Sequence, residues 1–158
     1  MDCMEQEPVF FELTDSGNFL RITVLNQSYT NASDNWDKNW INCRIQAKSG
    51  AFSGTFDAQF MTTDFESFKQ QLRRVYESLK GTANFHCLDD YVNIIVTGDG
   101  IGHLKAKCTL MESNIPLNEL TFELEFDQTY LPDIISQLNN ITRTFPIIGD
   151  FSKLRNEY

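Results

Sequence analysis

One pattern occurs twice along the chain: strands with alternating apolar residues run into a helix with an apolar stripe. A spacing of two indicates a half-buried strand, and a spacing of three or four indicates a helix with one buried side. The two copies align without a gap at an offset of 66 residues. The matched positions are Phe56, Ala58, Phe60, Phe65, Phe68, Leu72, Val75 and Leu79 in the first copy and Phe122, Leu124, Phe126, Leu131, Ile134, Leu138, Ile141 and Phe145 in the second. Identity between the copies is low, so the pattern indicates a repeated architecture and does not prove a duplication.

Further alternating segments precede each copy and complete two antiparallel meanders. The predicted strands are residues 9–13, 19–25, 40–48, 52–60, 91–97, 103–110 and 120–126. Turns rich in Asp, Asn and Gly separate the paired strands, because these residues supply local hydrogen bonds and tolerate positive φ. We therefore expect an α+β fold: an antiparallel sheet of about six to seven strands in two meander-then-helix units, with two helices packed on one face. The other face carries charges of both signs, suited to cross-strand pairs, at Arg44, Asp57, Lys105, Lys107, Glu123 and Glu125.

Each predicted helix has recognisable ends. Thr63 and Glu66 have the spacing of a capping box at the start of the first helix, and Gly81 is a typical stop. The second helix is expected to start near Thr129, with Pro132 in its first turn, where no backbone N–H is needed.

Length and composition favour one domain, residues 1–158, with a core over about 9–148 and flexible termini. Hydrophobic residues make up 41% of the chain and thirteen are Phe, so we expect an aromatic core. No apolar run approaches the roughly 20 residues that span a bilayer. The acidic N-terminus lacks the apolar segment of a secretory signal, which favours a cytoplasmic location. The four cysteines are far apart and are expected to be buried thiols.

The formal net charge of −9 bears on the class of partner. Phosphates would repel such a chain, which argues against direct binding of nucleic acid and against anionic membrane surfaces. A basic protein would instead be attracted by long-range steering. Acidity that serves only solubility is the alternative explanation.

The sequence contains little that indicates catalysis. His86 and Cys87 lie close to two aspartates, but neighbours on an extended chain point to opposite faces, so they should not form a base and nucleophile. The glycines of residues 98–102 lack the spacing and the following helix of a phosphate loop, and they predict a hairpin turn. No metal-binding or nucleophile motif is present. We therefore expect no catalytic residue, no cofactor and no metal.

Several motifs, taken in order, resemble a bacterial family of immunity proteins, the WapI-like antitoxins of wall-associated polymorphic tRNase toxins. The motifs are Asp34-Asn35-Trp36-Asp37 to Trp40, Gly50-x-Phe52-x-Gly54, Phe65-Glu66-x-Phe68 with Leu72, Tyr76, Leu79 and Gly81, Gly98-Asp99-Gly100-x-Gly102, and Phe126-Asp127-Gln128-Thr129-Tyr130-Leu131 leading to Phe145-Pro146. They cover roughly residues 10–146. The resemblance implies a cytoplasmic, non-enzymatic antitoxin that binds and neutralises a basic nuclease domain, delivered from a neighbouring cell, with fixed stoichiometry. In the absence of its partner, the protein is expected to be a monomer or a weak dimer.

Candidate partner-binding residues lie in predicted loops. They are Asp34, Trp36, Asp37, Asp89, Asp90, Asp99 and Glu112. For each carboxylate the alternative is a solvated loop residue, and for Trp36 it is a lid over the edge of the core. Two other functions remain open: a small-molecule-binding or hydrolytic domain, which would have a deep pocket, and a generic adaptor that uses a sheet edge.

Overall fold

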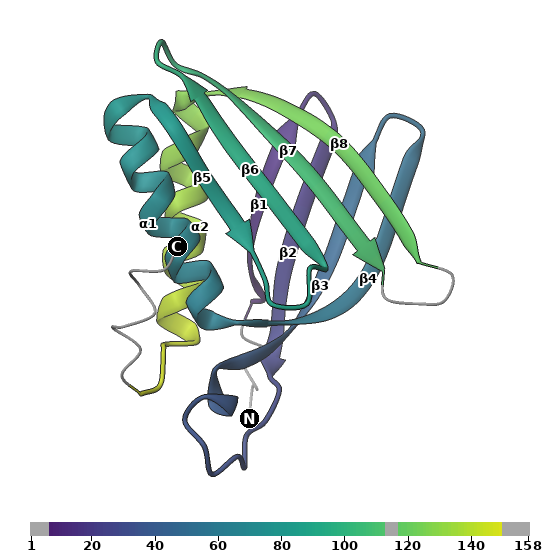
Figure 1. Cartoon of the computed structure of the whole chain (residues 1–158), viewed down its shortest axis with the longest axis vertical. Coiled ribbons are helices and arrows are strands. Elements are labelled where there is room, and N and C mark those ends of the chain that lie inside the picture. The colour runs from purple at the N-terminus through teal and green to yellow at the C-terminus, as the bar shows by residue number, and fades with distance from the viewer. Residues whose placement is uncertain (1–6, 113–116, 150–158) are drawn as a thin grey trace.

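The computed structural model describes residues 7–112 and 117–149, so the expectation for the termini lies outside the described residues. Four strands and a helix follow one another twice (Figure 1). The first unit contains β1 (Val9–Asp15), β2 (Asn18–Gln27), β3 (Trp40–Ser49), β4 (Phe52–Met61) and α1 (Thr62–Ser78). The second contains β5 (Lys80–His86), β6 (Val92–Asp99), β7 (His103–Glu112), β8 (Asn118–Asp127) and α2 (Leu131–Thr144). Short 3-10 turns, η1 (Asp37–Asn39) and η2 (Gln128–Tyr130), precede β3 and α2.

The strands form two antiparallel sheets, where the sequence predicted one. Their orders are β1-β2-β3-β4 and β5-β6-β7-β8. Figure 1 shows the second sheet in front of the first and the two helices side by side along one flank. α1 packs on β5, α2 packs on β1, and the helices pack on each other. The prediction that both helices cover one face of a single sheet is therefore wrong: each unit builds its own sheet, and the apolar faces bury one another.

Strand β5 is the element that the sequence pattern missed. Its two inward residues are Ala83 and Phe85, too short an alternation to stand out from a loop. Gly81 does not end the helix. α1 ends at Ser78, Leu79 adopts the left-handed conformation with φ of 61°, and β5 begins at once.

The start of α1 also differs from the prediction. The helix begins one residue earlier than the proposed Thr63–Glu66 box, at Thr62. The carboxylate that closes its first turn belongs to Asp64, whose Oδ2 accepts the Met61 N–H at 3.0 Å. The second helix agrees better with the sequence, because η2 and α2 follow one another and Pro132 lies in the first turn of α2.

An aromatic cluster joins the two units, as the phenylalanine content predicted. Phe85 of β5 lies 5.2–5.6 Å, between ring centroids, from four other rings. Those rings are Phe11, Phe60, Phe65 and Phe68, all without exposed surface. The missed strand therefore supplies the central ring of the core. The described cysteines, Cys43, Cys87 and Cys108, are buried and free as expected, and Cys3 lies outside the described residues.

The outer sheet faces carry the charge pairs that their mixed signs predicted. Arg44 lies 3.0 Å from Asp57, and Lys105 lies 3.7 Å from both Glu123 and Glu125. Arg21 and Glu12, 2.7 Å apart, form a further ion pair that was not among the predicted charges. Within the described part of the chain, no helix has the length and apolar character needed to cross a bilayer.

Candidate partner-binding surface

The long connection between β2 and β3, residues 28–39, is held in place by one buried asparagine. Asn39 has no exposed surface, and its side-chain nitrogen donates to the carbonyls of Asn35 and Ile148 at 2.9 Å each. Its side-chain oxygen accepts the Ile148 N–H at 2.8 Å, and its own carbonyl accepts from the Thr62 hydroxyl at 3.3 Å. These bonds tie the connection to the start of α1 and to the segment after α2, so the acidic side chains on it have a fixed support.

Local bonds then shape the second half of the connection, residues 34–39. The Asp34 carboxylate accepts the Trp36 N–H at 2.8 Å, and the Asn39 N–H donates to the Trp36 carbonyl at 3.1 Å. Asp34 and Asp37 remain exposed, while Trp36 and Trp40 are half-buried. Both tryptophans therefore offer only part of their surface to a partner.

The second acidic segment is the tight connection between β5 and β6. The Asp90 N–H donates to the Cys87 carbonyl at 3.2 Å, and Asp90 takes a positive φ of 56° to turn the chain. His86 Nε2 lies 3.1 Å from Asp90 Oδ1. Leu88 and Asp89 project from the turn, and Leu88 is 59% exposed.

A groove of about 650 Å³ lies between these two segments. Tyr29, Asp37 and Trp40 line it from the β2–β3 connection and the start of β3. Leu88 and Asp89 line it from the β5–β6 turn. Among the described residues that line it, none is Lys, Arg or His. Two carboxylates that are distant in sequence thus share one groove with two aromatic rings, a surface suited to a cationic side chain.

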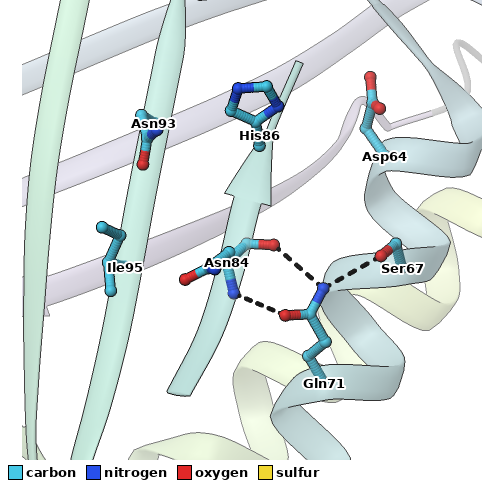
Figure 2. A pocket seen from close by; sticks show the side chains of 7 residues that line it. All are labelled: Asp64, Ser67, Gln71, Asn84, His86, Asn93 and Ile95. Carbon is cyan, nitrogen blue, oxygen red and sulfur yellow. Dashed lines mark hydrogen bonds between the residues drawn. The ribbon is translucent and has the colours of Figure 1, made fainter. Parts of the chain in front are cut away.

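A neighbouring cleft of about 210 Å³ runs between α1 and β5 (Figure 2). Asp64 lies at one end of it and is 7% exposed. Burial raises the pKa of Asp64 to about 7, the Met61 N–H opposes that rise, and the charge of Asp89 adds to it. Asp64 therefore adds little negative charge to the surface at neutral pH, because most of its carboxyl is covered and its pKa is raised to about 7.

The remaining predicted residues divide between the two ends of the second sheet. The Met111 N–H donates to the Tyr91 carbonyl at 2.9 Å, which places the half-buried Glu112 on the same side as the β5–β6 turn. Asp99 lies at the opposite end of β6. Its pKa is lowered mainly because the Ile101 N–H donates to the carboxylate, at 2.9 Å. Of the acidic candidates, the structure therefore brings Asp37 and Asp89 into one groove. Asp34 and Asp90 lie on the same two segments, Glu112 lies at the end of the second sheet that holds the β5–β6 turn, and Asp99 closes the β6–β7 turn at the other end.

The geometry at His86 and Cys87 agrees with the expectation that they face apart. His86 is exposed, whereas Cys87 is buried and directs its Sγ to the Val92 carbonyl at 3.7 Å. Burial raises the pKa of the Cys87 thiol, which disfavours a reactive thiolate. Over residues 7–112 and 117–149, no group of three His, Cys, Asp or Glu side chains could hold a metal ion.

Three residues that shape this surface were not predicted from the sequence. They are Asn39, Asp64 and Gln71. Each acts through contacts with segments far along the chain or with a backbone group. A lone Asn, Asp or Gln carries no local signal for such a role.

The fold and the groove together describe an α+β protein with two sheets and an acidic surface at one end. A sequence model of the Immunity protein WapI-like family matches residues 10–146. Because this match covers most of the chain, the protein belongs to that family. Membership supports an antitoxin role with a toxin protein as partner, in a family that is generally non-catalytic.

Two solved structures have a similar fold. A crystal structure of MRP1/MRP2 from Trypanosoma bruciei matches over 88% of this chain and 86% of that chain, with 15% identity and a TM-score of 0.50. A crystal structure of WHY1 from Arabidopsis thaliana matches over 96% of this chain and 91% of that chain, with 10% identity and a TM-score of 0.50. Among curated proteins, none matches the chain. Identities this low show a shared arrangement of elements alone.

Proposed function

We propose that this protein is a cytoplasmic antitoxin that binds a basic nuclease toxin domain one to one and blocks its RNA-binding surface. The observation that carries the proposal is the groove in which Asp37 and Asp89 meet, with no basic side chain among the described residues that line it. The toxin's binding face would occupy this groove and the adjoining residues Asp34, Trp36, Asp90 and Glu112.

Charge supports this choice of partner. A nuclease holds phosphates with Arg and Lys side chains, so its working face is positively charged. Carboxylates held on a rigid support present the same sign of charge as RNA, and the net charge of −9 steers such a partner toward the protein. Tyr29 and Leu88 add exposed apolar surface at the groove, which favours a retained complex.

The first experiment is to look for a candidate toxin domain encoded beside this protein and to co-express the two. Rescue of growth, a one-to-one complex on co-purification and loss of RNA cleavage in vitro would support the proposal. Continued killing with no complex would refute the pairing. A complex with a toxin that leaves RNA intact would retain the antitoxin role and reject the nuclease.

The binding face is tested by reversing charge. We expect the double variant Asp37→Lys with Asp89→Lys to raise the dissociation constant at least about tenfold, with most of the loss in the association rate at low salt. The double variant Glu77→Lys with Asp133→Lys is the matched control, because it makes the same change in net charge at two exposed residues, near the end of α1 and in the first turn of α2. Equal protection by all variants would exclude the groove as the interface.

A small-molecule or hydrolytic role makes a different prediction. It would require a ligand in the cleft between α1 and β5, next to Asp64 and His86. Ligand-induced NMR shifts confined to that cleft, in the absence of any toxin complex, would favour it over the antitoxin role.

A further inference from the structure

Two of the four outer sheet edges are covered by helices. α2 packs along β1, and α1 packs along β5 (Figure 1). Figure 2 shows the contact between α1 and β5: the side chain of Gln71 forms hydrogen bonds with the backbone at the edge of β5. Its Oε1 accepts the Asn84 N–H at 2.9 Å, and its Nε2 donates to the Asn84 carbonyl at 3.3 Å. These two edges are closed to another strand.

The third edge, β8, is protected by charge and by a side-chain cap. β8 carries three glutamates, Glu119, Glu123 and Glu125. The Glu125 N–H donates to Asp15 Oδ2 at 3.0 Å, so the β1–β2 turn occupies that part of the edge. A row of carboxylates repels a second acidic chain, a common protection of edge strands.

The fourth edge, β4, has no covering helix, no row of carboxylates and no side-chain cap among the described residues. β4 pairs with β3 on one side, and no strand of the described chain pairs with its other side. Figure 1 shows it at the margin of the first sheet. Its one charged residue, Asp57, is bonded to Arg44 of the same sheet at 3.0 Å, and the strand contains no Lys or Pro. Phe52, at its start, is 69% exposed. Unprotected edges of this length are sites of strand addition.

We propose that β4 pairs with β4 of a second copy of this chain, antiparallel, about a twofold axis at Thr55. Residues 52–58 then lie opposite their own counterparts in reverse order. Phe52 faces the partner's Ala58, and Phe56 faces the partner's Gly54, so large side chains meet small ones. Asp57 faces the partner's Ser53, so no like charges meet across the pair.

The occupant is a second copy because β4 suits another acidic chain better than a basic toxin. Its carboxylate is already paired with Arg44, so a cationic strand would gain little there. Two chains that each carry a net charge of −9 approach with least repulsion along an edge without free charge. Pairing limited to residues 52–58 also leaves Gln59 free to line the groove at the other end of β4.

Sedimentation equilibrium over a concentration series tests self-association of the full chain. We expect an average mass that rises from the 18.2 kDa of one chain toward twice that value as concentration increases. Thr55→Cys in a Cys3→Ser background then tests the register, because paired Thr55 residues bring their Cα atoms within disulfide reach. Oxidation should give a cross-linked dimer. Thr82→Cys, on the outer face of the covered strand β5, should stay monomeric under the same conditions.

Charge at the axis gives an independent test. Thr55→Lys places two ammonium groups opposite one another and should raise the dimer dissociation constant about fivefold at low salt, with recovery in high salt. Thr82→Lys is the control. A monomer at every concentration overturns the proposal, and so does a dimer that neither variant at Thr55 affects. A monomer whose toxin affinity falls with Thr55→Lys would assign the edge to a toxin strand instead.

Discussion

Replacing the buried carboxyl at the start of α1 should make the protein more stable at neutral pH and leave it unchanged in acid. Asp64 accepts the Met61 N–H at 3.0 Å and is 7% exposed. Asp64→Asn retains an oxygen for that bond and nearly the same volume, but it carries no charge at any pH. The comparison therefore isolates the cost of ionising a covered carboxyl.

The magnitude follows from the two pKa values. The carboxyl has a pKa near 3.8 when solvated and about 7 in the fold, a difference of roughly 3, and each pKa unit corresponds to about 1.4 kcal/mol. Below pH 3.8 both states are protonated and no penalty exists. As pH rises toward 7 the unfolded chain ionises first, so the free energy of unfolding falls. Above pH 7 the penalty levels off at roughly 4 kcal/mol.

Urea unfolding of both proteins between pH 4 and pH 8 measures the effect. The stability of Asp64→Asn relative to the original chain should increase by roughly 4 kcal/mol across this range. Other titrating groups are common to both proteins, so most of their effect cancels. A relative stability that stays constant with pH would refute the argument, as would a carboxyl ¹³C titration of Asp64 with its midpoint near 4.

Three stability predictions concern other parts of the fold, each measured by thermal and urea unfolding. Asn39→Ala removes three hydrogen bonds of a buried side chain and should cost about 2 kcal/mol; a neutral result would show that the β2–β3 connection does not depend on them. Gly98→Ala should cost at least about 1 kcal/mol, because its Cβ would lie 2.5 Å from the Leu79 carbonyl oxygen, whereas Gly54→Ala meets open space and should differ little. Equal effects of these two alanines would contradict the close approach. Phe85→Ala empties the centre of the aromatic cluster and should cost about 3–5 kcal/mol; a loss below about 1 kcal/mol would place the core elsewhere.

The sequence reveals elements well where the signal is local. Alternation over residues 103–110 and 120–126 predicted β7 and β8, and the apolar stripe of α2 predicted its buried side. Alternation reports which side of a strand is buried, so it also gave the outer charge pairs, such as Lys105 with Glu123. Alternation did not reveal β5, because Gly81 and the small inward residue Ala83 weaken the apolar pattern of that strand.

The surface was predictable only in part. Acidic loop residues can be found from the sequence, but their grouping depends on where the strands carry them. Asp37 and Asp89 meet because β2–β3 and β5–β6 open toward the same end, while Asp99 is carried to the other end by the length of β6. Asn39 went unnoticed because its partner Ile148 lies beyond α2.

By itself, the sequence determined the α+β class, the acidic charge and the pattern of strands and a helix that occurs twice. It also showed the resemblance to WapI-like immunity proteins, and the family match confirms that resemblance. The division into two sheets and the position of the helices between β1 and β5 were decided by tertiary structure alone. The physical reason is that periodicity records whether a face is buried, whereas the identity of what buries it depends on packing between residues far apart in the chain.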